Sequence, residues 1–337
     1  MSLIFIFVDG VGLAPAGPDN PLSDASTPTL RGLLGGPLTL ETTNDQPPTT
    51  KAGPNGGRSP LVVRPVLFKP IDATLGVAGL PQSGTGHTAL LAGVNAPALH
   101  GRHQPHFPPV ALRPPLAERS IFRRVAARGG RATFANAFGP GYWEALAARR
   151  IRRSASVIAA EGAGLRFRDG DDLRAGRALS WDVTGAAMHA RGLDAPLVTP
   201  RQAGANLARL ALDHDLVFYE SFLPDLAGHG RLTTDDRPPT TDLDETDAPS
   251  SVGGRRSSAK AQIQAVMALL DGLIGGALEE LRAEDTLLLT SDHGNVESLS
   301  APTHTRNPVP LLAVGPGAAA FAAVGNIAQV ADAIMSL

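Results

Sequence analysis

The sequence predicts an α/β protein with a mostly parallel central sheet flanked by helices. Residues 3–8 (LIFIFV) form a continuous β-branched and aromatic run, which is typical of a strand buried on both faces of a parallel sheet. Similar runs occur at 216–222, 286–290 and 310–314. Between the second and third runs, apolar residues recur at three- and four-residue spacing, which predicts a helix with one face on the sheet. These residues are Ile263, Val266, Leu270, Leu273, Ile274, Ala277 and Leu281. Strand, helix and strand in this order predict a right-handed βαβ unit.

Composition narrows the class of protein. A chain of 337 residues can form one large domain and a smaller one. The formal charge of −2 provides no basic surface for nucleic acid or an anionic membrane. Cysteine is absent, which excludes disulfides, thiolate metal ligands and cysteine nucleophiles. The first apolar run lacks a basic flank and is followed at once by Asp9, so it does not match a signal peptide. No other apolar run approaches the ~20 residues of a membrane helix. We therefore expect a soluble, cytoplasmic protein.

Three segments depart from the strand and helix pattern. Residues 41–60 and 232–258 are rich in Pro, Gly, Thr and Asp and nearly lack large apolar side chains. Such a composition cannot offset the entropy of ordering, so both are predicted to be flexible insertions. Residues 98–205 are rich in arginine and short turns, and they separate two groups of polar motifs. We predict that this segment is an inserted cap or substrate domain, and that residues 1–97 and 206–337 form the catalytic core.

Aspartates and histidines cluster next to the predicted strands. The residues are Asp9, then Ser83 and His87, then Asp225 and His229, then Asp292 and His293, and finally His304. Because the carboxyl ends of parallel strands meet at one edge of a sheet, these side chains are expected to converge there. Three aspartates and three of these four histidines, without cysteine, form an oxygen and nitrogen site that suits Zn²⁺ or Mn²⁺. A single ion with so many ligands would be saturated, so two divalent ions are the better prediction.

Each of these fragments also has an ordinary structural interpretation. Asp-Gly after a strand is usually a turn, and Asp225 with His229 could be an exposed helix pair. Asp-His-Gly could be a capping turn, and His304 could be a solvated loop residue. The joint placement of all five fragments beside strands favours the metal site.

The segment around Ser83 has features of a nucleophile site. Gly84 and Gly86 would let the backbone approach a ligand, and a helix that starts near Gly86 would direct its N–H groups at an anion. A metal could lower the pKa of the Ser83 hydroxyl for attack. Two alternatives are that Ser83 only caps the helix and that Thr85 is the nucleophile.

Together these motifs resemble those of cofactor-independent phosphoglycerate mutase and phosphopentomutase, in the alkaline phosphatase superfamily. The matching motifs are Asp-Gly-x-Gly at 9–12 with Asn20 and Thr27-Pro28, Ser-x-x-Gly-His at 83–87, Pro-Asp-x-x-Gly-His at 224–229, Asp-His-Gly-Asn-x-Glu at 292–297 and His-Thr-x-Asn-Pro-Val-Pro at 304–310. They lie within residues 1–97 and 213–337.

The resemblance implies an alkaline-phosphatase-like sandwich with a smaller inserted α+β cap. It implies one metal held by Asp225, His229 and His304. It implies a second metal held by Asp9, Asp292, His293 and Ser83, with Ser83 also the nucleophile that becomes phosphoserine. The implied substrate is a small phosphate monoester.

The reaction and the substrate stay open. The segment between the core halves is shorter than the phosphotransferase domain of phosphoglycerate mutases and lacks their Asp-Arg-Asp-x-Arg-Trp element. It is closer in size to the phosphopentomutase cap but has no pentose-phosphate signature. If water accepts the phosphoryl group from the phosphoserine, the protein is a phosphatase. If a second hydroxyl of the retained alcohol accepts it, the protein is a mutase. The alternatives are a phosphodiesterase or sulfatase of the same superfamily, or a non-catalytic metal- or phosphate-binding module. The absence of cysteine argues against a formylglycine sulfatase. The presence of Ser83 as a possible nucleophile argues against a non-catalytic binding module.

Several residues are candidates to contact an anionic substrate. His87 and Arg306 adjoin the core motifs, and Glu297 is predicted to be a supporting or structural residue. The candidates in the predicted cap are Arg102, His103, His106, Arg113, Asn136, Tyr142, Arg152 and Arg153.

Overall fold

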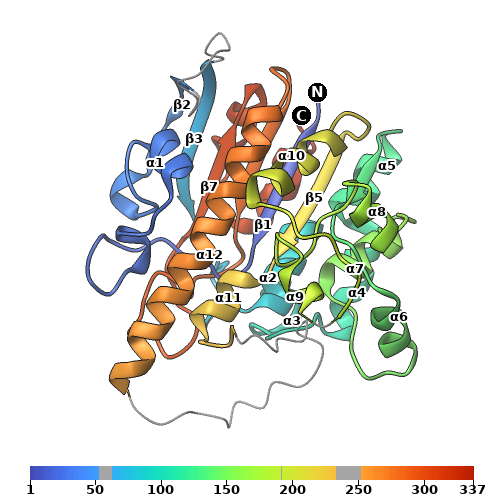
Figure 1. Ribbon diagram of the computed structural model, residues 1–337, viewed down its shortest axis with the longest axis horizontal. Helices are drawn as coiled ribbons and strands as arrows, with labels where there is room; N and C mark the ends of the chain where they lie inside the picture. The colour runs from blue at the N-terminus through green and yellow to red at the C-terminus, as the bar shows by residue number, and fades with distance from the viewer. Residues whose placement is uncertain (53–62, 191, 233–251) are drawn as a thin grey trace.

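A seven-stranded sheet forms the centre of the molecule (Figure 1). The computed structural model describes residues 1–52, 63–190, 192–232 and 252–337. The strands are β1 (Leu3–Val8), β2 (Asn44–Ala52), β3 (Val63–Ile71), β4 (Ala132–Phe134), β5 (Leu216–Ser221), β6 (Thr286–Thr290) and β7 (Val309–Val314). Their order across the sheet is β2-β3-β7-β6-β1-β5-β4. The four strands β6, β1, β5 and β4 are parallel, whereas β7 is antiparallel to β6, β3 to β7 and β2 to β3.

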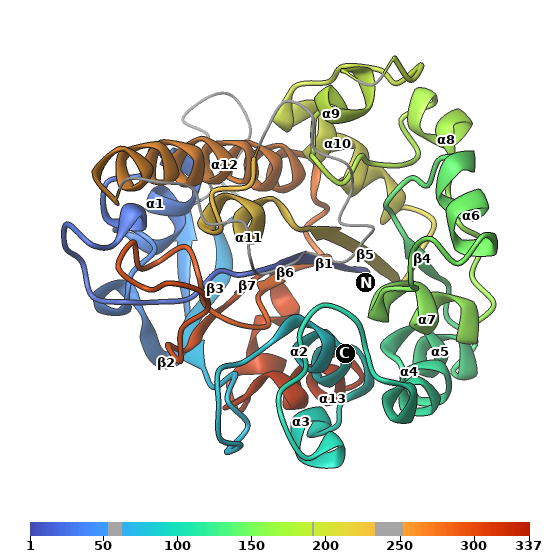
Figure 2. The same cartoon turned by 90° about the horizontal axis from the view of Figure 1, so that it is seen from below.

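Helices cover both faces of the sheet. They are α1 (Pro28–Leu34), α2 (Ser83–Ala92), α3 (Ala96–His100), α4 (Arg113–Arg119), α5 (Ile121–Ala127), α6 (Pro140–Ala147), α7 (Ala155–Gly162), α8 (Gly170–Arg174), α9 (Ala186–His189), α10 (Pro200–Leu210), α11 (Leu223–Gly228), α12 (Val252–Glu280) and α13 (Val330–Ile334). In Figure 2, α10, α11 and α12 lie on one side of the sheet, and α2, α3 and α13 lie on the other. The α/β class with a mostly parallel sheet between helices is therefore confirmed.

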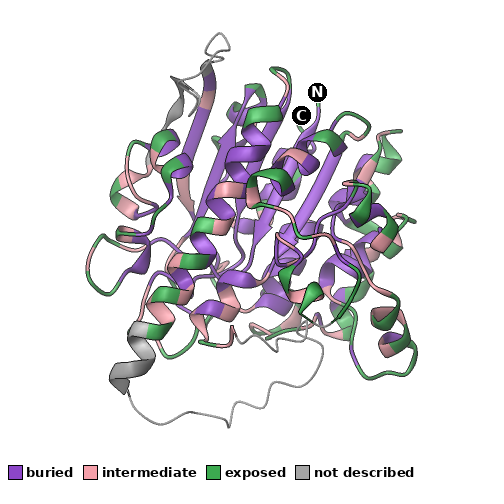
Figure 3. Ribbon diagram, viewed as in Figure 1, coloured by how far each residue is buried: buried purple, intermediate pink, exposed green. Residues whose placement is uncertain are grey.

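The alternation of side chains along β1 divides the core in two. Ile4, Ile6 and Val8 pack into one hydrophobic cluster together with α10 and α12. The residues between them point to the opposite face, where they pack with α2, α5, α7 and α13. Figure 3 shows the consequence, a buried sheet beneath helices whose outer surfaces are exposed.

Helix α12 contains the predicted apolar face. All seven of the residues predicted for it are buried in the cluster on the α10 side, and Leu281 directly follows the last residue of the helix. Residues 258–280 are also long and apolar enough to cross a membrane by length and composition, which corrects the expectation that no second apolar run reaches that length. Since 61% of the apolar window is buried inside the molecule, this helix has the character of a core helix.

Parts of the predicted insertions are regular structure. Residues 44–52 form strand β2, and residues 252–258 belong to helix α12. The other predicted flexible stretches, 53–60 and 233–251, lie outside the described residues. The predicted cap, 98–205, contributes β4 to the edge of the central sheet, where it pairs with β5. It is thus joined to the core by a strand, and its separation as a domain stays a prediction.

The topology brings the motifs to one edge of the sheet. The carboxyl ends of β1, β5 and β6 lie together because these strands are parallel. Since β7 is antiparallel, the residues that precede it lie at this same edge, and this places His304 there. Helices α2 and α11 are at the same end of the sheet in Figure 1.

Candidate metal centre

The more exposed part of the site is a cluster of Asp225, His229 and His304, called here cluster 1. Their ligand atoms lie within 4.8 Å of one another. The Nε2 atoms of His229 and His304 are 3.4 and 3.5 Å from Asp225 Oδ1, and 3.3 Å from each other. The side chains of Asp225 and His229 are 19% and 18% exposed, so this end of the site opens to solvent.

The deeper part, called cluster 2, consists of Asp9, Asp292, His293 and Ser83. His293 Nε2 lies 3.1 Å from Asp9 Oδ1, 3.3 Å from Asp292 Oδ2 and 3.0 Å from Ser83 Oγ. The two clusters adjoin, because ligand atoms of Asp9, Asp225 and His293 also lie within 4.8 Å of one another. All seven residues that the sequence predicts as metal ligands are therefore brought together.

His87 lies in cluster 2 as well. Its Nε2 is 3.2 Å from Asp9 Oδ2 and 3.3 Å from Asp292 Oδ2, and the side chain is buried. Its ring packs edge-on against Phe7, with ring centroids 4.5 Å apart. The sequence predicted a substrate contact for His87, whereas the structure places it against two of the predicted metal ligands.

Histidines balance the buried carboxylates. Burial alone would raise the pKa of Asp9, but the charge of His87 and the proximity of His293 outweigh it and lower that pKa. Burial would likewise lower the pKa of His293, yet Asp292 and Asp9 raise it to about 10. The pKa of His87 is raised for the same reason, against the effect of burial. In the absence of other cations, the histidines are therefore the positive charges of the cluster.

The donor atoms fit divalent cations. Both carboxylate oxygens of Asp292 are buried, and neither accepts a hydrogen bond from the described residues. A buried carboxylate without such partners is costly unless it meets a positive charge. Carboxylate oxygens and imidazole nitrogens without sulfur are the ligands that Zn²⁺ and Mn²⁺ accept. Each cluster supplies such a set.

Helix α2 positions Ser83 as its first residue. The helix begins at Ser83 rather than near Gly86, and its N-cap is Gln82. No side-chain hydrogen bond caps this helix, which removes the alternative that Ser83 serves as a cap. Thr85 is fully buried, and its hydroxyl donates to Gln82 O and accepts from Gln104 N at 3.2 Å. Of the two candidate nucleophiles, only Ser83 therefore faces the histidines and aspartates.

The glycines after Ser83 are required by contacts within the protein. A Cβ atom on Gly84 would lie 2.6 Å from Phe107 O, and one on Gly86 would lie 2.8 Å from Asp292 Cβ. We expected both glycines to make room for a ligand. Instead, they make room for loop 104–107 and for Asp292, which pack closely against the helix.

Glu297 joins the three ligand loops. Its Oε2 accepts hydrogen bonds from Gly12 N and Asn295 N, both at 2.9 Å. Its Oε1 accepts from Asn307 Nδ2 at 3.0 Å and from the Thr305 hydroxyl. The carboxylate is buried, and its four donors come from the segments that carry Asp9, His293 and His304. It therefore holds these segments in a fixed relation, which agrees with the predicted supporting role.

We expect Glu297→Gln to lower both stability and activity. The amide would place an NH₂ group against donors that now face a carboxylate oxygen, so the free energy of unfolding should fall by about 2–4 kcal/mol. Looser ligand loops should lower kcat/KM and metal affinity by roughly 10–100-fold. The control is Glu279→Gln, which removes the partly exposed ion pair with Arg201 and should cost about 1 kcal/mol or less. Equal small effects of both changes on denaturant unfolding and kcat/KM would contradict this role.

Two further contacts orient cluster 1, and neither was predicted. Asn295 Nδ2 donates to Asp225 Oδ1 at 2.7 Å, and His304 Nδ1 lies 3.0 Å from Pro81 O. A hydrogen bond from Nδ1–H to this carbonyl would leave Nε2 of His304 free to bind a metal. The Asn of the Asp-His-Gly-Asn motif was the available sequence signal for the first contact. A backbone carbonyl gives no signal in the sequence.

The predicted substrate residues are dispersed. Asn136 is buried, and its side-chain amide pairs with both backbone groups of Glu220, at 2.8 and 3.0 Å. It therefore supports β5 instead of facing a substrate. His103 Nε2 contacts Val77 O at 3.3 Å, and Arg153 pairs with Glu161. Arg102, Arg113, Arg152, Arg306 and His106 are exposed.

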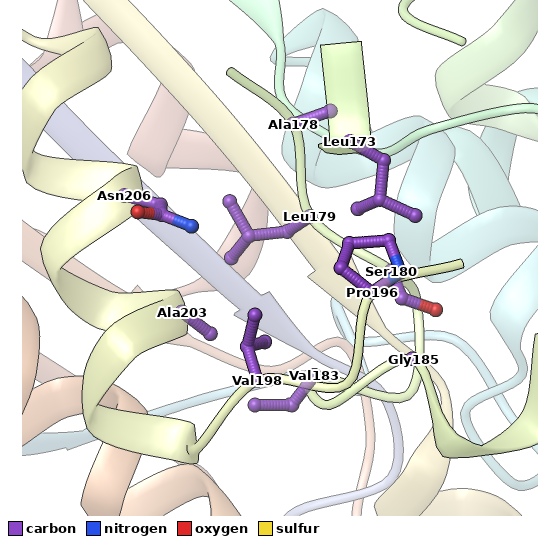
Figure 4. Close-up of a pocket in the computed structure, with 10 residues that line it drawn as sticks. All are labelled: Leu173, Ala178, Leu179, Ser180, Val183, Gly185, Pro196, Val198, Ala203 and Asn206. Carbon is purple, nitrogen blue, oxygen red and sulfur yellow. The ribbon is translucent and has the colours of Figure 1, made fainter. Parts of the chain in front are cut away.

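The cavity in Figure 4 is separate from these residues. It has a volume of about 10 Å³ and is lined mainly by apolar residues such as Leu173, Leu179 and Val198. This volume is enough for about one water molecule. No residue of cluster 1 or cluster 2 lines it. We therefore assign it no substrate.

Comparison with known proteins finds similarity to metalloenzymes in part of the chain. A model of the metalloenzyme superfamily matches residues 241–337, which include Asp292, His293 and His304. A segment of 63 residues, 19% of this chain, is 40% identical to phosphopentomutase of Limosilactobacillus reuteri and covers 16% of that protein. A segment of 139 residues, 39% of this chain, is 31% identical to 2,3-bisphosphoglycerate-independent phosphoglycerate mutase of Dinoroseobacter shibae and covers 22% of it.

The fold is similar to that of a solved alkaline phosphatase. The structure of alkaline phosphatase from the Antarctic bacterium TAB5 matches 99% of this chain and 97% of its own, with a TM-score of 0.50 and 12% identity. The predicted resemblance to metalloenzymes of the alkaline phosphatase superfamily is confirmed. Because the aligned segments cover less than a quarter of each mutase, the reaction of those relatives does not transfer to this chain directly.

Proposed function

We propose that this protein is a metal-dependent enzyme that transfers the phosphoryl group of a small phosphate monoester through a phosphoserine at Ser83. The observation that carries the proposal is the position of Ser83 Oγ, 3.0 Å from His293 Nε2, at the start of helix α2 and beside both clusters. A nucleophile, an anion-binding helix end and a set of metal ligands then occupy one place.

Two divalent ions, Mn²⁺ or Zn²⁺, would be held by the two clusters. Asp225, His229 and His304 would hold one ion, and Asp9, Asp292, His293 and Ser83 would hold the other. The ions would supply positive charge for the phosphate oxygens and for the attacking and leaving oxygens.

The chain's own residues carry out the transfer. Ser83 Oγ, deprotonated beside the bound cations, attacks phosphorus, so that the Oγ–P bond forms as the bond from phosphorus to the substrate alcohol breaks. The proton of Ser83 is released to water, and the departing alcohol oxygen takes one up from water. The N–H groups of Ser83 and Gly84, in the first turn of α2, donate to no backbone carbonyl among the described residues and can donate to a phosphate oxygen. Water or a second hydroxyl then attacks the phosphoserine, and Ser83 is restored.

The acceptor decides between a phosphatase and a mutase. Cluster 1 is the exposed end of the site, so the alcohol part of the substrate would lie on that side. We propose that residues 98–205, as the predicted cap, control the entry of water. We further propose that the partner is a small phosphorylated molecule, with no nucleic acid or membrane involved, and that the protein is cytoplasmic.

A substrate screen tests the proposed reaction. Purified, Mn²⁺-loaded protein is incubated with a panel of phosphate monoesters, and free phosphate and isomerised product are measured separately. A phosphodiester and an aryl sulfate are included in the panel. Preference for the diester or the sulfate would favour the alternative hydrolases. Metal binding without turnover of any substrate would favour a non-catalytic module.

We expect close to two divalent ions per chain after loading with Mn²⁺ or Zn²⁺, because each cluster supplies a complete set of ligands. His229→Gln should lower the content to near one ion, measured by elemental analysis of dialysed protein. His214→Gln is the matched control, since that ring contacts Leu210 O, away from both clusters. Metal content near zero in the loaded wild type would contradict the two-metal proposal.

A further inference from the structure

Helix α2 brings two side chains to cluster 2 from one face. Residues four apart are neighbours on a helix surface, and Ser83 and His87 have this spacing. Ser83 Oγ lies 3.0 Å from His293 Nε2. His87 Nε2 lies 3.2 Å from Asp9 Oδ2 and 3.3 Å from Asp292 Oδ2. All ten residues of the helix are buried, so both side chains start from a fully packed element.

Aromatic side chains fix the ring of His87. Phe7 packs edge-on against it, with centroids 4.5 Å apart and planes at 80°. Phe222 lies nearly parallel to it, with centroids 6.1 Å apart and planes at 20°. The imidazole is thus held by packing on β1 and on the residue after β5. The position of Nε2 is therefore set by the fold as well as by the carboxylates that it contacts.

The contacts with α2 distinguish the two oxygens of each aspartate. Asp9 Oδ2 faces His87, whereas Asp9 Oδ1 faces His293 at 3.1 Å. Asp292 Oδ2 is 3.3 Å from both rings and would be 3.0 Å from a Cβ atom on Gly86, so it lies against the helix. Asp292 Oδ1 accepts no hydrogen bond from the described residues. One oxygen of each carboxylate is therefore directed at His87, and the other is left for an ion.

His87 also lies between two like charges. Ligand atoms of Asp9, His87 and Asp292 are within 4.8 Å of one another, and carboxylates so close in a buried site repel each other. His87 Nε2 makes no aligned hydrogen bond with either carboxylate, although it is in contact distance of both. It is therefore shared by the two carboxylates instead of being bound to one.

We propose that His87 is a positioning residue that holds Asp9 and Asp292 in the orientation that binds the ion of cluster 2. This role rests on the two-metal site proposed above. His87 acts through the two carboxylates and is not itself a ligand. Because Ser83 is one turn earlier on the same helix, the orientation of these ligands is tied to the position of the nucleophile.

The test measures each cluster separately. In His229→Gln only cluster 2 keeps its full set of ligands, and in His293→Gln only cluster 1 does. His87→Leu, added to each, removes the polar edge of the ring and keeps an apolar side chain between Phe7 and Phe222. The Kd for Mn²⁺, measured by calorimetry, should rise roughly 10–100-fold in the His229→Gln protein. It should change by less than ~2-fold in the His293→Gln protein.

Two further variants and a spectrum separate positioning from other roles. Thr88→Val is the matched control on the same helix, since its buried hydroxyl donates to Gly84 O at 2.8 Å, and it should leave both Kd values unchanged. His87→Gln keeps an N–H group near the place of Nε2 and should recover part of the affinity of cluster 2. Co²⁺ bound in place of Mn²⁺ should keep its absorption bands in His87→Leu, because its ligands stay the same.

The outcomes are distinct. An unchanged Kd of cluster 2 in His87→Leu would overturn the role, and so would an equal loss at both clusters, which would indicate damage to the fold. Shifted Co²⁺ bands would make His87 a ligand and would also overturn it. A His229→Gln protein that bound no Mn²⁺ even with His87 intact would overturn the two-metal proposal, and this role with it.

Discussion

Ser83→Ala is expected to lower turnover by on the order of 10⁴–10⁶-fold while metal binding stays near normal. Alanine has no oxygen that can attack phosphorus. The six other predicted ligands, which contact one another directly, remain in place. The measurements are kcat with the best monoester from the screen, and metal content of the loaded variant.

The phosphoserine itself can be located. Wild-type protein is mixed briefly with substrate and quenched at low pH, and its peptides are analysed by mass spectrometry; the phosphate should be on Ser83. Thr85→Val is the matched control on the same helical turn, and it should retain most activity because its hydroxyl binds Gln82 O and Gln104 N. Phosphate on Thr85, or full activity of Ser83→Ala, would refute the assignment.

The central strands could be predicted because they are buried on both faces. Such strands are continuous apolar runs, and β1 and β6 have the predicted bounds. Two other strands gave no comparable signal. Strand β3 contains Pro65 and Pro70, which argue against a strand inside a sheet, and β4 has only three residues. Strand direction was also not predictable, although the antiparallel β7 is what brings His304 to the site.

The convergence of the ligands followed from the sheet, but the partner of each side chain did not. The spacing of Ser83 and His87 identifies a helix that carries both, yet only the packing of α2 shows that His87 meets Asp9 and Asp292. Asn136 looked available for substrate because nothing in its neighbourhood in sequence reveals that Glu220 lies beside it. Contacts between segments far apart in the chain are decided by the fold, so local patterns predict the motifs better than their roles.

Asp292→Asn is expected to lower kcat by at least ~10⁴-fold and to remove the stabilisation that bound metal provides. The side chain is 0% exposed, and no described residue donates a hydrogen bond to either of its oxygens. It faces Nε2 of His87 and of His293, each 3.3 Å from Oδ2, and a bound metal ion would supply the positive charge in place of these rings. In metal-free protein the free energy of unfolding should also fall, by about 1–3 kcal/mol, because Asp292 Oδ2 lies 3.3 Å from Nε2 of both His87 and His293 and stabilises their positive charge.

The contrast with another buried aspartate makes this prediction specific. Asp271 is as deeply buried as Asp292 in practical terms, but its two oxygens accept hydrogen bonds from Thr29 N and Leu30 N at 3.0 and 2.8 Å. Asp271→Asn should lower the free energy of unfolding by about 1–3 kcal/mol and leave the metal-induced rise in Tm intact, because an amide replaces only one of the two acceptors. Thermal unfolding with and without Mn²⁺ measures both effects. A strong loss of stability in metal-free Asp292→Asn, together with an unchanged rise in Tm on adding Mn²⁺, would show that Asp292 serves the fold instead of the metal.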